Sequence, residues 1–410
     1  MKNKVILVWF RNDLRLHDNR VLHEAIERKS IIIPVYCFDE RYYKVNRYNN
    51  KNTGIKRAQF IRESVLELKE RLQKVNSDLM VFKGFPEEII PRLTAKYEVD
   101  EVYHHREIAS RETDISDRVE TAIWAQQINL KYFIGHTLYH KEDLPYSVLD
   151  IPDTFQTFKK ELERESFLRD PKPTLTNILT PQHLEKTEVP SLEELGFSKE
   201  EKNRLSNKIM RGGELTALDR LNDFCNAKDE TKKITEITPY IANGLLSPIH
   251  TYETIKVAIG KKDKPFLRLL LDFLFWRDYC RFMLKKYPNV FFQNFYHKIH
   301  PSSPKLRLWK ENRTGVEIID NAIMQIKELG DISYPLRKIV GRYLLEECET
   351  HWVEGTSFFE EHLLDYEPAT HYSYWSHLAG KGTSKKDNKP SDWRMLAKAY
   401  LQEDNKYLQA

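Results

Sequence analysis

The chain is 410 residues long and carries a net charge of +4, from 65 Lys and Arg against 61 Asp and Glu. This length exceeds one ordinary hydrophobic core and predicts two domains, while the mildly basic balance permits nucleic-acid binding without requiring it. The opening has no signal-peptide pattern, and no apolar run approaches the ~20 residues of a membrane span, which predicts a cytoplasmic protein without a membrane partner.

Short β-branched and aromatic runs alternate with amphipathic stretches through residues 1–135. The runs have the composition of buried strands: Val5–Phe10, Ile31–Phe38, Leu79–Phe82, Glu101–His104 and Leu130–Ile134. The stretches between them predict helices: Asn19–Arg28, Ile55–Val75, Pro86–Tyr97 and Ser110–Gln127. This alternation predicts a Rossmann-like α/β domain with a parallel sheet. Because no GxGxxG or Walker sequence occurs here, motif evidence excludes an ordinary dinucleotide or nucleoside triphosphate site.

The pattern changes near Gly135. Prolines interrupt residues 136–207, which predicts an interdomain connector with short helical pieces such as Ser191–Leu195. Residues 208–410 then predict an all-α domain, with helices expected over Glu214–Cys225, Pro248–Ala258, Lys264–Lys286, Gly315–Leu329 and Leu336–Glu349. Within them, Phe266–Met283 is apolar nearly all round, which indicates a helix buried on several sides.

The cysteines give no sign of a metal or a disulfide framework. Cys37, Cys225, Cys280 and Cys348 are far apart and form no CxxC pair. We therefore expect reduced, mostly buried thiols and no metal site.

Three stretches of the chain carry a family resemblance. They are Val8–Asn19 (VWFRNDLRLHDN), Trp276–Tyr279 (WRDY), and a run from Thr314 through Arg337, Trp352, Asp365 and Trp375 to Gly380. In order and spacing they resemble the photolyase/cryptochrome family, nearest to the DASH cryptochromes. The segments Gly212–Glu214 and Asn243–Pro248 agree with the same family. The resemblance implies a front α/β domain followed by a helical domain that binds FAD, with the flavin ring deep inside.

The resemblance also implies residues that hold the flavin. Arg337 and Asp365 match a salt bridge beside the ring, in which a cation stabilises the reduced flavin and a carboxylate fixes that cation. A structural ion pair between helices is the alternative. Tyr366 and Glu367 match the short segment that lies against the cofactor. The flavin-facing Asn of photolyases falls on His371, a titratable group that can still donate to the ring.

Tryptophans are expected to pass electrons to the flavin. Trp375 and Trp352 match the inner and middle members of the family's electron-transfer chain, although ordinary core packing is the alternative. The outer member falls on Ile299, which cannot be oxidised. A nearby aromatic side chain would have to replace it, and the candidates are Tyr296, Trp309 and Tyr374.

The segment that binds the cofactor's phosphates departs from the family pattern. Thr235 and Thr238 keep two hydroxyls as pyrophosphate ligands, but Glu236 places a negative charge between them. The family carries an Arg in this segment, and the stretch before it is shortened here. These changes weaken the expectation of FAD binding.

The expected substrate pocket departs further. The Glu that contacts a pyrimidine dimer falls on Phe273, and the Asn-Arg pair falls on Tyr334-Pro335. The second aromatic of the C-terminal Trp-x-Trp falls on His377, and Trp276 alone is kept as a stacking wall. Each lost polar contact would cost about 1–3 kcal/mol, which argues against ordinary dimer repair. The altered pocket could instead read another lesion or a single-stranded base by stacking.

Two further sites are predicted. Basic residues cluster along one region and could neutralise DNA phosphates, or else form a solvated face: Arg277, Arg281, Lys285, Lys286, Lys298, Lys305 and Arg307. Relatives often carry an antenna chromophore, a folate or a flavin, in the front domain. Glu112 is the candidate residue for it here.

Three functions stay open from the sequence. The first is a photolyase-like enzyme, a carbon–carbon lyase in which light-excited FAD repairs damaged pyrimidines, or DASH-like DNA binding. The second is a cryptochrome-type photoreceptor without repair. The third is a non-catalytic binding protein that has lost FAD. The basic cluster supports DNA, damaged or single-stranded, as a partner, and no protein partner can be read from the sequence.

Overall fold

A parallel sheet forms the centre of the front domain. The computed structural model describes residues 3–206, 208–228, 232–288, 303–383 and 391–408. Five strands run in the spatial order β3-β2-β1-β4-β5, and each pairs in parallel with its neighbours. Their bounds are β1 (Val5–Phe10), β2 (Ile31–Phe38), β3 (Met80–Lys83), β4 (Glu101–His105) and β5 (Asn129–Phe133). The predicted α/β domain is confirmed. β1 and β2 have the predicted bounds, and the ends of β3, β4 and β5 lie no more than one residue from their predicted positions.

Helices cover both faces of this sheet. On one face α1 (Arg20–Glu27) and α2 (Ile55–Lys74) pack against the side chains of Ile6, Val8 and Phe10. On the other, α3 (Pro86–Lys96) and α4 (Ser110–Trp124) pack against Leu7 and Trp9. Alternate residues of β1 therefore serve two cores, which is why the strand is apolar throughout. Strand order reverses between β1 and β4, and such a point opens a crevice at the carboxyl ends of the strands.

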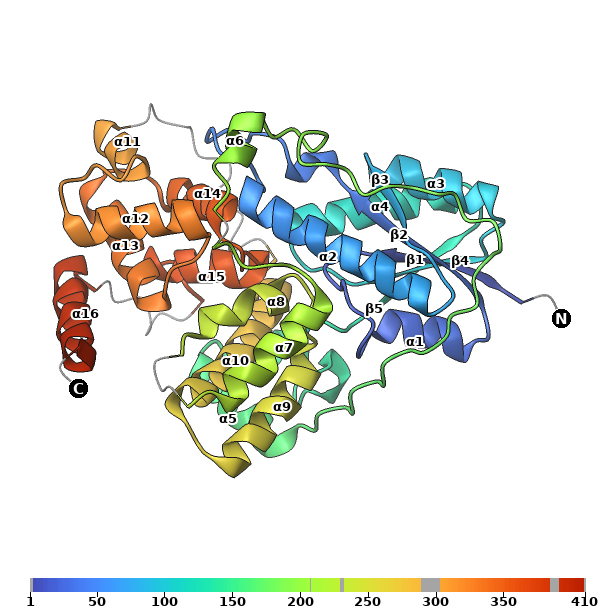
Figure 1. Cartoon of the computed structure of the whole chain (residues 1–410). Helices are drawn as coiled ribbons and strands as arrows, with labels where there is room; N and C mark the ends of the chain where they lie inside the picture. Colours follow the sequence, from blue (N-terminus) through green and yellow to red (C-terminus); the bar gives the residue numbers. More distant parts are fainter. Residues whose placement is uncertain (1–2, 207, 229–231, 289–302, 384–390, 409–410) are drawn as a thin grey trace.

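The second domain is helical, as predicted (Figure 1). Its helices are α7 (Glu214–Asn226), α8 (Thr238–Ala242), α9 (Pro248–Lys261), α10 (Pro265–Lys286), α11 (Pro304–Lys310), α12 (Glu317–Leu329), α13 (Tyr334–Glu347), α14 (Trp352–His362), α15 (Pro368–Leu378) and α16 (Trp393–Leu408). Helix α10 is buried on several sides, in agreement with its apolar sequence.

After a helix that lies beside the helical domain, the connector runs along the front domain and then returns to the helical domain at α7 (Figure 1). The Ile178 N–H donates to the Val75 carbonyl at 3.0 Å, and the Ile32 N–H to the Leu179 carbonyl at 2.7 Å. The connector contains α5 (Phe155–Glu165), which packs on α10, and the short α6 (Lys199–Asn203). The helical piece predicted at Ser191–Leu195 is wrong, because this segment forms turns around a single Leu195 N–H to Ser191 carbonyl bond. The domain boundaries at 135 and 207 stay a prediction.

Buried polar groups join the two domains. Glu214, the first residue of α7, accepts bonds from the backbone N–H groups of Leu16–His17 at 2.7 and 3.0 Å. Asp278 of α10 accepts from the N–H groups of Leu138–Tyr139 at 2.9 and 2.8 Å. These carboxylates explain why the sequence keeps charged residues at positions that become fully buried.

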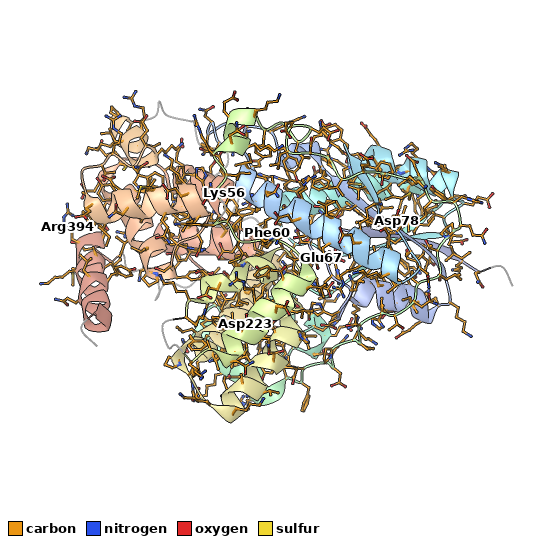
Figure 2. All side chains as sticks on the ribbon, in the orientation of Figure 1. Lys56, Phe60, Glu67, Asp78, Asp223 and Arg394 are labelled. Atoms are coloured by element: carbon orange, nitrogen blue, oxygen red, sulfur yellow. The ribbon has the colours of Figure 1, made fainter. Side chains whose placement is uncertain are left out.

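Helix α2 is a second point of contact. Phe60, labelled in Figure 2, packs on Tyr240 of α8 with ring centroids 5.4 Å apart. Glu67, also labelled in Figure 2, lies two turns further along α2. Its carboxylate accepts a hydrogen bond from the Leu215 N–H at 2.8 Å. The front domain thus supports the helical domain through both apolar and polar contacts.

Three general expectations can be compared with this fold. All four cysteines are buried. Across the described ranges, no set of three or more His, Cys, Asp or Glu side chains is arranged to hold a metal ion. Among the helices of those ranges, none combines the length and the apolar character needed to cross a membrane.

Candidate cofactor and nucleic-acid sites

Arg337 and Asp365 form the buried ion pair that the sequence predicted. The two guanidinium Nη atoms donate to the two Asp365 oxygens at 3.0 and 2.9 Å. Nη2 also donates to Asp331 at 3.2 Å, and Nε to the Ile332 carbonyl at 2.9 Å. Thr238 donates its hydroxyl to Asp365 at 2.8 Å. The carboxylates hold the pKa of Arg337 above its ordinary value despite burial, so the group stays charged.

The aromatic ring of Tyr334 covers this ion pair. The guanidinium carbon of Arg337 lies 4.5 Å from the Tyr334 ring centroid. Phe273 of α10 packs on the same tyrosine, with centroids 6.0 Å apart. Both residues occupy positions where the family resemblance placed substrate contacts. The ring of Tyr334 thus packs on protein groups while the residue stays partly exposed, and its role as a substrate contact stays a prediction.

His371 is buried and neutral near pH 7. Its Nε2–H donates to the Thr356 carbonyl at 3.0 Å. Burial, together with the charge of Arg337, lowers its pKa to about 4. The ring also packs on Tyr366, with centroids 5.0 Å apart. The expected donation to a flavin is not supported, because a neutral imidazole has one N–H and the backbone takes it.

Trp375 and Trp352 are buried in separate aromatic groups. Trp375 packs edge-on against Phe359 at 5.2 Å, and Phe359 lies 6.3 Å from the nearly parallel ring of Trp309. Trp352 packs on Tyr372 at 6.3 Å. Of the candidates to replace the outer tryptophan, Trp309 thus belongs to the aromatic group of Trp375. Tyr374 is largely buried, with a hydroxyl that has no partner. Ile299 and Tyr296 lie outside the described residues.

The phosphate segment forms a short 3-10 helix, Ile234–Glu236, and the first residue of α8, Thr238. Thr235 is buried and its hydroxyl has no partner, whereas the hydroxyl of Thr238 is bound to Asp365. Glu236 pairs with Lys232 at 2.8 Å, and both side chains are about one third exposed. The negative charge of Glu236 therefore points outward and is neutralised at the surface.

A flavin was expected among these residues, and the side chains present do not fit one. The Arg337 and Asp365 side chains are only 7% and 3% exposed. His371 is 8% exposed and Trp375 is fully buried. An empty cavity for a ligand of this size would measure about 300–1,000 Å³ and would leave the groups around it accessible to water. The nucleic-acid function proposed first below does not depend on FAD.

An open cavity lies on the neighbouring side of α10. It has a volume of about 250 Å³ and is lined by Trp276, Tyr279, Phe155, His377 and Ser373, with Thr154, Gln156, Met283, Ser376, Gly382 and Thr383. Trp276 meets Phe155 edge-on at 5.3 Å and Tyr279 at 5.6 Å. Two predicted substrate residues, Trp276 and His377, thus come together. Sequence reasoning missed Phe155 and Tyr279, because α5 was not assigned and Tyr279 was noted only as part of a motif.

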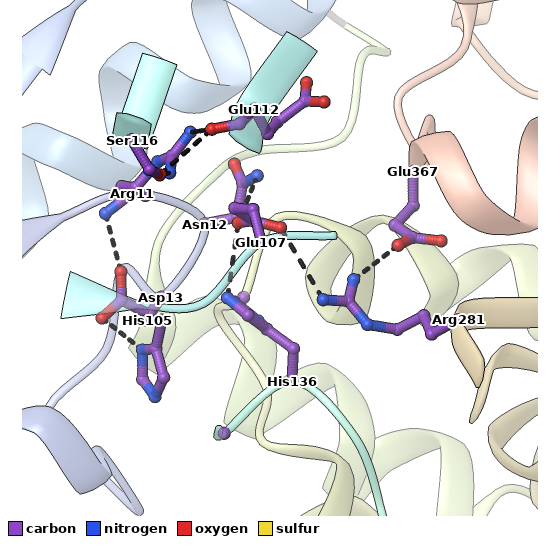
Figure 3. Close-up of polar contacts among 12 residues, drawn as sticks. Arg11, Asn12, Asp13, His105, Glu107, Glu112, Ser116, His136, Arg281 and Glu367 are labelled. Atoms are coloured by element: carbon purple, nitrogen blue, oxygen red, sulfur yellow. Dashed lines mark hydrogen bonds and ion pairs between the residues drawn. The ribbon is translucent and has the colours of Figure 1, made fainter. Parts of the chain in front are cut away.

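Arg277 and Arg281 are not DNA contacts, and this prediction is corrected. Both are buried between the domains: Arg277 donates to the His136 carbonyl, and Arg281 donates to Glu367 at 2.6 Å (Figure 3). Glu107 of the front domain lies 3.7 Å from Arg281 on the other side (Figure 3). Their charges hold the domain interface together and do not face solvent.

The remaining basic residues divide into paired and clustered groups. Lys286 pairs with Asp153 at 2.8 Å and Lys305 with Glu349 at 3.2 Å. Lys285, at the end of α10, has its pKa lowered by partial burial and by the nearby charges of Lys141 and Arg106. Lys285 therefore lies among like charges that come from separate segments of the chain, which the sequence did not reveal. Arg307 is exposed beside Glu311, and Lys298 lies outside the described residues.

The crevice at the carboxyl ends of β1, β2 and β4 holds a cavity of about 110 Å³. Trp9, Tyr36 and Tyr42 contribute aromatic walls, and Tyr42 donates to Glu112 at 3.0 Å. Arg11 donates to the Glu112 carbonyl and to Ser116 (Figure 3). Burial raises the pKa of Glu112. The predicted antenna residue does lie in a pocket, at the place where such sheets bind ligands.

Comparison with known families agrees with this architecture. A profile described as DNA photolyase matches residues 6–176, and one described as the FAD binding domain of DNA photolyase matches residues 270–400. The Cryptochrome DASH of Xenopus laevis is 34% identical over 415 residues, which cover 94% of this chain and 78% of the relative. That of Synechocystis sp. is 31% identical over 401 residues, covering 93% and 82%.

Solved structures give the same result. A cryptochrome from Synechocystis sp. superposes with a TM-score of 0.88 at 29% identity, covering 98% of this chain and 88% of that one. A class III photolyase from Agrobacterium tumefaciens gives 0.81 at 22% identity, covering 98% and 85%. An archaeal photolyase from Sulfolobus tokodaii, solved with two FAD molecules, gives 0.74 at 24%, covering 93% and 84%. The last two likenesses show the fold alone.

Proposed function

Because this chain belongs to the photolyase/cryptochrome family, we propose that it binds DNA and receives an extruded or single-stranded base in the cavity beside Trp276. The observation that carries this proposal is the composition of that cavity. Its walls are aromatic, and its rim offers hydroxyls, an amide and an imidazole. The flat rings suit the face of a base, and the polar groups suit its edge.

The charges near the cavity support a nucleic-acid ligand. Lys285 follows the lining residue Met283 on α10 but lies on a different face of the helix, so it would meet the strand beside the cavity together with the nearby positive charges of Lys141 and Arg106. A phosphate placed among three cations would relieve their mutual repulsion, so binding should weaken as salt rises.

Repair of pyrimidine dimers through the family's contacts is not part of this proposal. Phe273 replaces a polar contact and packs on Tyr334, so both positions expected to read a dimer are occupied by an aromatic pair. Removing polar partners from a buried substrate edge costs about 1–3 kcal/mol each.

Fluorescence anisotropy with a labelled single-stranded oligonucleotide tests the DNA proposal. Base stacking on an aromatic is worth about 1–3 kcal/mol, so Trp276→Ala should weaken binding by roughly 5- to 150-fold. Trp124→Ala is the matched control, because Trp124 is 66% exposed on the front domain. If both variants bind as the wild type does, the base does not enter this cavity.

Light-driven electron transfer is the competing function; it requires a flavin beside the bidentate Arg337–Asp365 pair, which is the observation that favours it, and it is excluded if that position is filled by side chains. With the dimer-reading positions occupied, this candidate takes the photoreceptor form. Purified protein that shows a flavin spectrum and bleaches under blue light would establish it in place of a flavin-free binding protein.

A second chromophore, a folate or a flavin, is a proposal for the front crevice. Its aromatic walls and Glu112 suit a planar ligand, and a related fold from Sulfolobus tokodaii was solved with two FAD molecules. The cavity is smaller than the 300 Å³ or so of a drug-sized site, so side chains would have to move. Reconstitution with a folate, followed by fluorescence of the separated protein, tests it.

A further inference from the structure

We infer that the chain's own side chains fill the position at which relatives hold the flavin, so that the helical domain folds without FAD. The inference is independent of DNA binding, because it concerns the far side of Phe273 and not the cavity beside Trp276.

The Arg337–Asp365 ion pair and the groups bonded to it already have protein partners. Arg337 uses Nε and both Nη atoms on Asp331, Asp365 and the Ile332 carbonyl, and Tyr334 covers its face. Thr238 is bound to the same Asp365. A cofactor that needed these groups would first have to break buried bonds that have no alternative partner.

Aromatic side chains pack in two groups in this region. Phe273 contacts Tyr334, and Tyr334 lies over Arg337. On the other side of the ion pair, Tyr366 contacts His371. Arg57 of the front domain lies 4.8 Å from the Tyr366 ring centroid. These ring contacts come from four separate segments and occupy much of the region, while Phe273, Tyr334 and Tyr366 stay partly exposed and Arg57 and Tyr366 also line the cavity of about 110 Å³.

The local charge does not suit a pyrophosphate. Two carboxylates, Asp331 and Asp365, meet one guanidinium. Burial and the charge of Asp365 raise the pKa of Asp331 despite the opposing charge of Arg337. The unpartnered hydroxyls of Thr235 and Tyr374 could each pair with a water molecule, but neither supplies a positive charge.

Two measurements on the full wild-type chain test the inference without DNA. The protein is incubated with excess FAD, separated by gel filtration and examined by absorption. It is also melted with and without FAD, since a ligand that binds only the folded state raises Tm. We expect no flavin band and no shift in Tm. A stoichiometric flavin band or a Tm that rises with FAD concentration would overturn the inference.

A cavity-opening variant tests the cause. Phe273→Ala combined with Tyr334→Ala removes the two rings and should allow uptake of lumiflavin, the ring system without phosphates, read as quenched fluorescence. Tyr343→Ala is the matched control, because Tyr343 lies on the same helix α13 but packs on Trp393 of α16, with centroids 5.0 Å apart. It should not bind lumiflavin.

The outcomes separate clearly. Uptake by the double variant alone supports filling by these aromatics, and uptake by the wild type contradicts it. A folded double variant that excludes lumiflavin would also contradict the assigned cause. If the double variant does not fold, the single change Tyr334→Asn is used in the same assay, with the same reading of its result.

Discussion

Two neighbouring regions of the helical domain differ although the same helix borders both. Around Arg337 the side chains pack into a closed core, whereas beside Trp276 they leave a cavity of about 250 Å³. Phe273 and Trp276 are only three residues apart on α10, and the first faces Tyr334 while the second faces Phe155. The Phe273 and Tyr334 rings pack against each other and fill the space between them. The aromatic rings beside Trp276 form the walls of a cavity that also has hydroxyl groups in its lining. The two proposals together imply that the family fold keeps its shape while its binding site moves by one helical turn.

The largest expected effect is a loss of stability when the ion pair of the closed region is broken. Asp365→Ala would leave Arg337 buried without its bidentate partner, which should cost about 3–5 kcal/mol of unfolding free energy. Urea unfolding followed by circular dichroism measures it. The exposed Arg307→Ala should stay within about 0.5 kcal/mol of the wild type. A small loss in Asp365→Ala would show that this region is open to water.

Acid should weaken the same region through His371. The folded-state pKa is about 4, below the ordinary value of 6.5, so the unfolded chain binds the proton first. Stability from this group is complete above pH 6.5 and is lost as pH falls toward 4, at about 1.4 kcal/mol per pH unit. Unfolding of wild type and His371→Asn between pH 7 and 4.5 should therefore show a shallower loss in the variant. Parallel curves would mean that His371 is exposed to solvent.

The salt dependence of DNA binding tests the open region beside Trp276. If Lys285 neutralises one phosphate, Lys285→Ala should reduce the slope of log K against log salt by about 0.7 for a single strand. Anisotropy titrations at several salt concentrations give the slope. Lys305→Ala is the control, because Lys305 is exposed and paired with Glu349. Equal slopes in all three proteins would place the DNA elsewhere.

The smallest effect concerns Glu236. Its pair with Lys232 is partly exposed, so Glu236→Gln should change unfolding free energy by less than about 0.5 kcal/mol. It should also leave the protein without flavin, because the inward-facing groups are unchanged. A variant that takes up FAD, read by absorption, would show that charge and not filling excludes the cofactor.

Much of the fold follows from the sequence. The strand and helix periods predicted both domains, and the ion pair of Arg337 and Asp365 was found from a motif. The cavity beside Trp276 was not predicted. One of its walls, Phe155, lies in the connector, in a helix α5 without a side-chain cap at its start. The burial of Arg277 and Arg281 was also missed. From sequence alone a basic residue is expected at the surface. The contacts of Arg281 with Glu107 and Glu367 show instead that it is buried in an ion-pair cluster.

Calorimetric titration of one preparation of the full chain, with FAD and with a single-stranded oligonucleotide, tests the central claim most directly. A closed core beside an open aromatic cavity predicts heat of binding with the oligonucleotide and none with FAD. Saturable binding of FAD at one per chain, without binding of the oligonucleotide, would contradict both halves of the comparison.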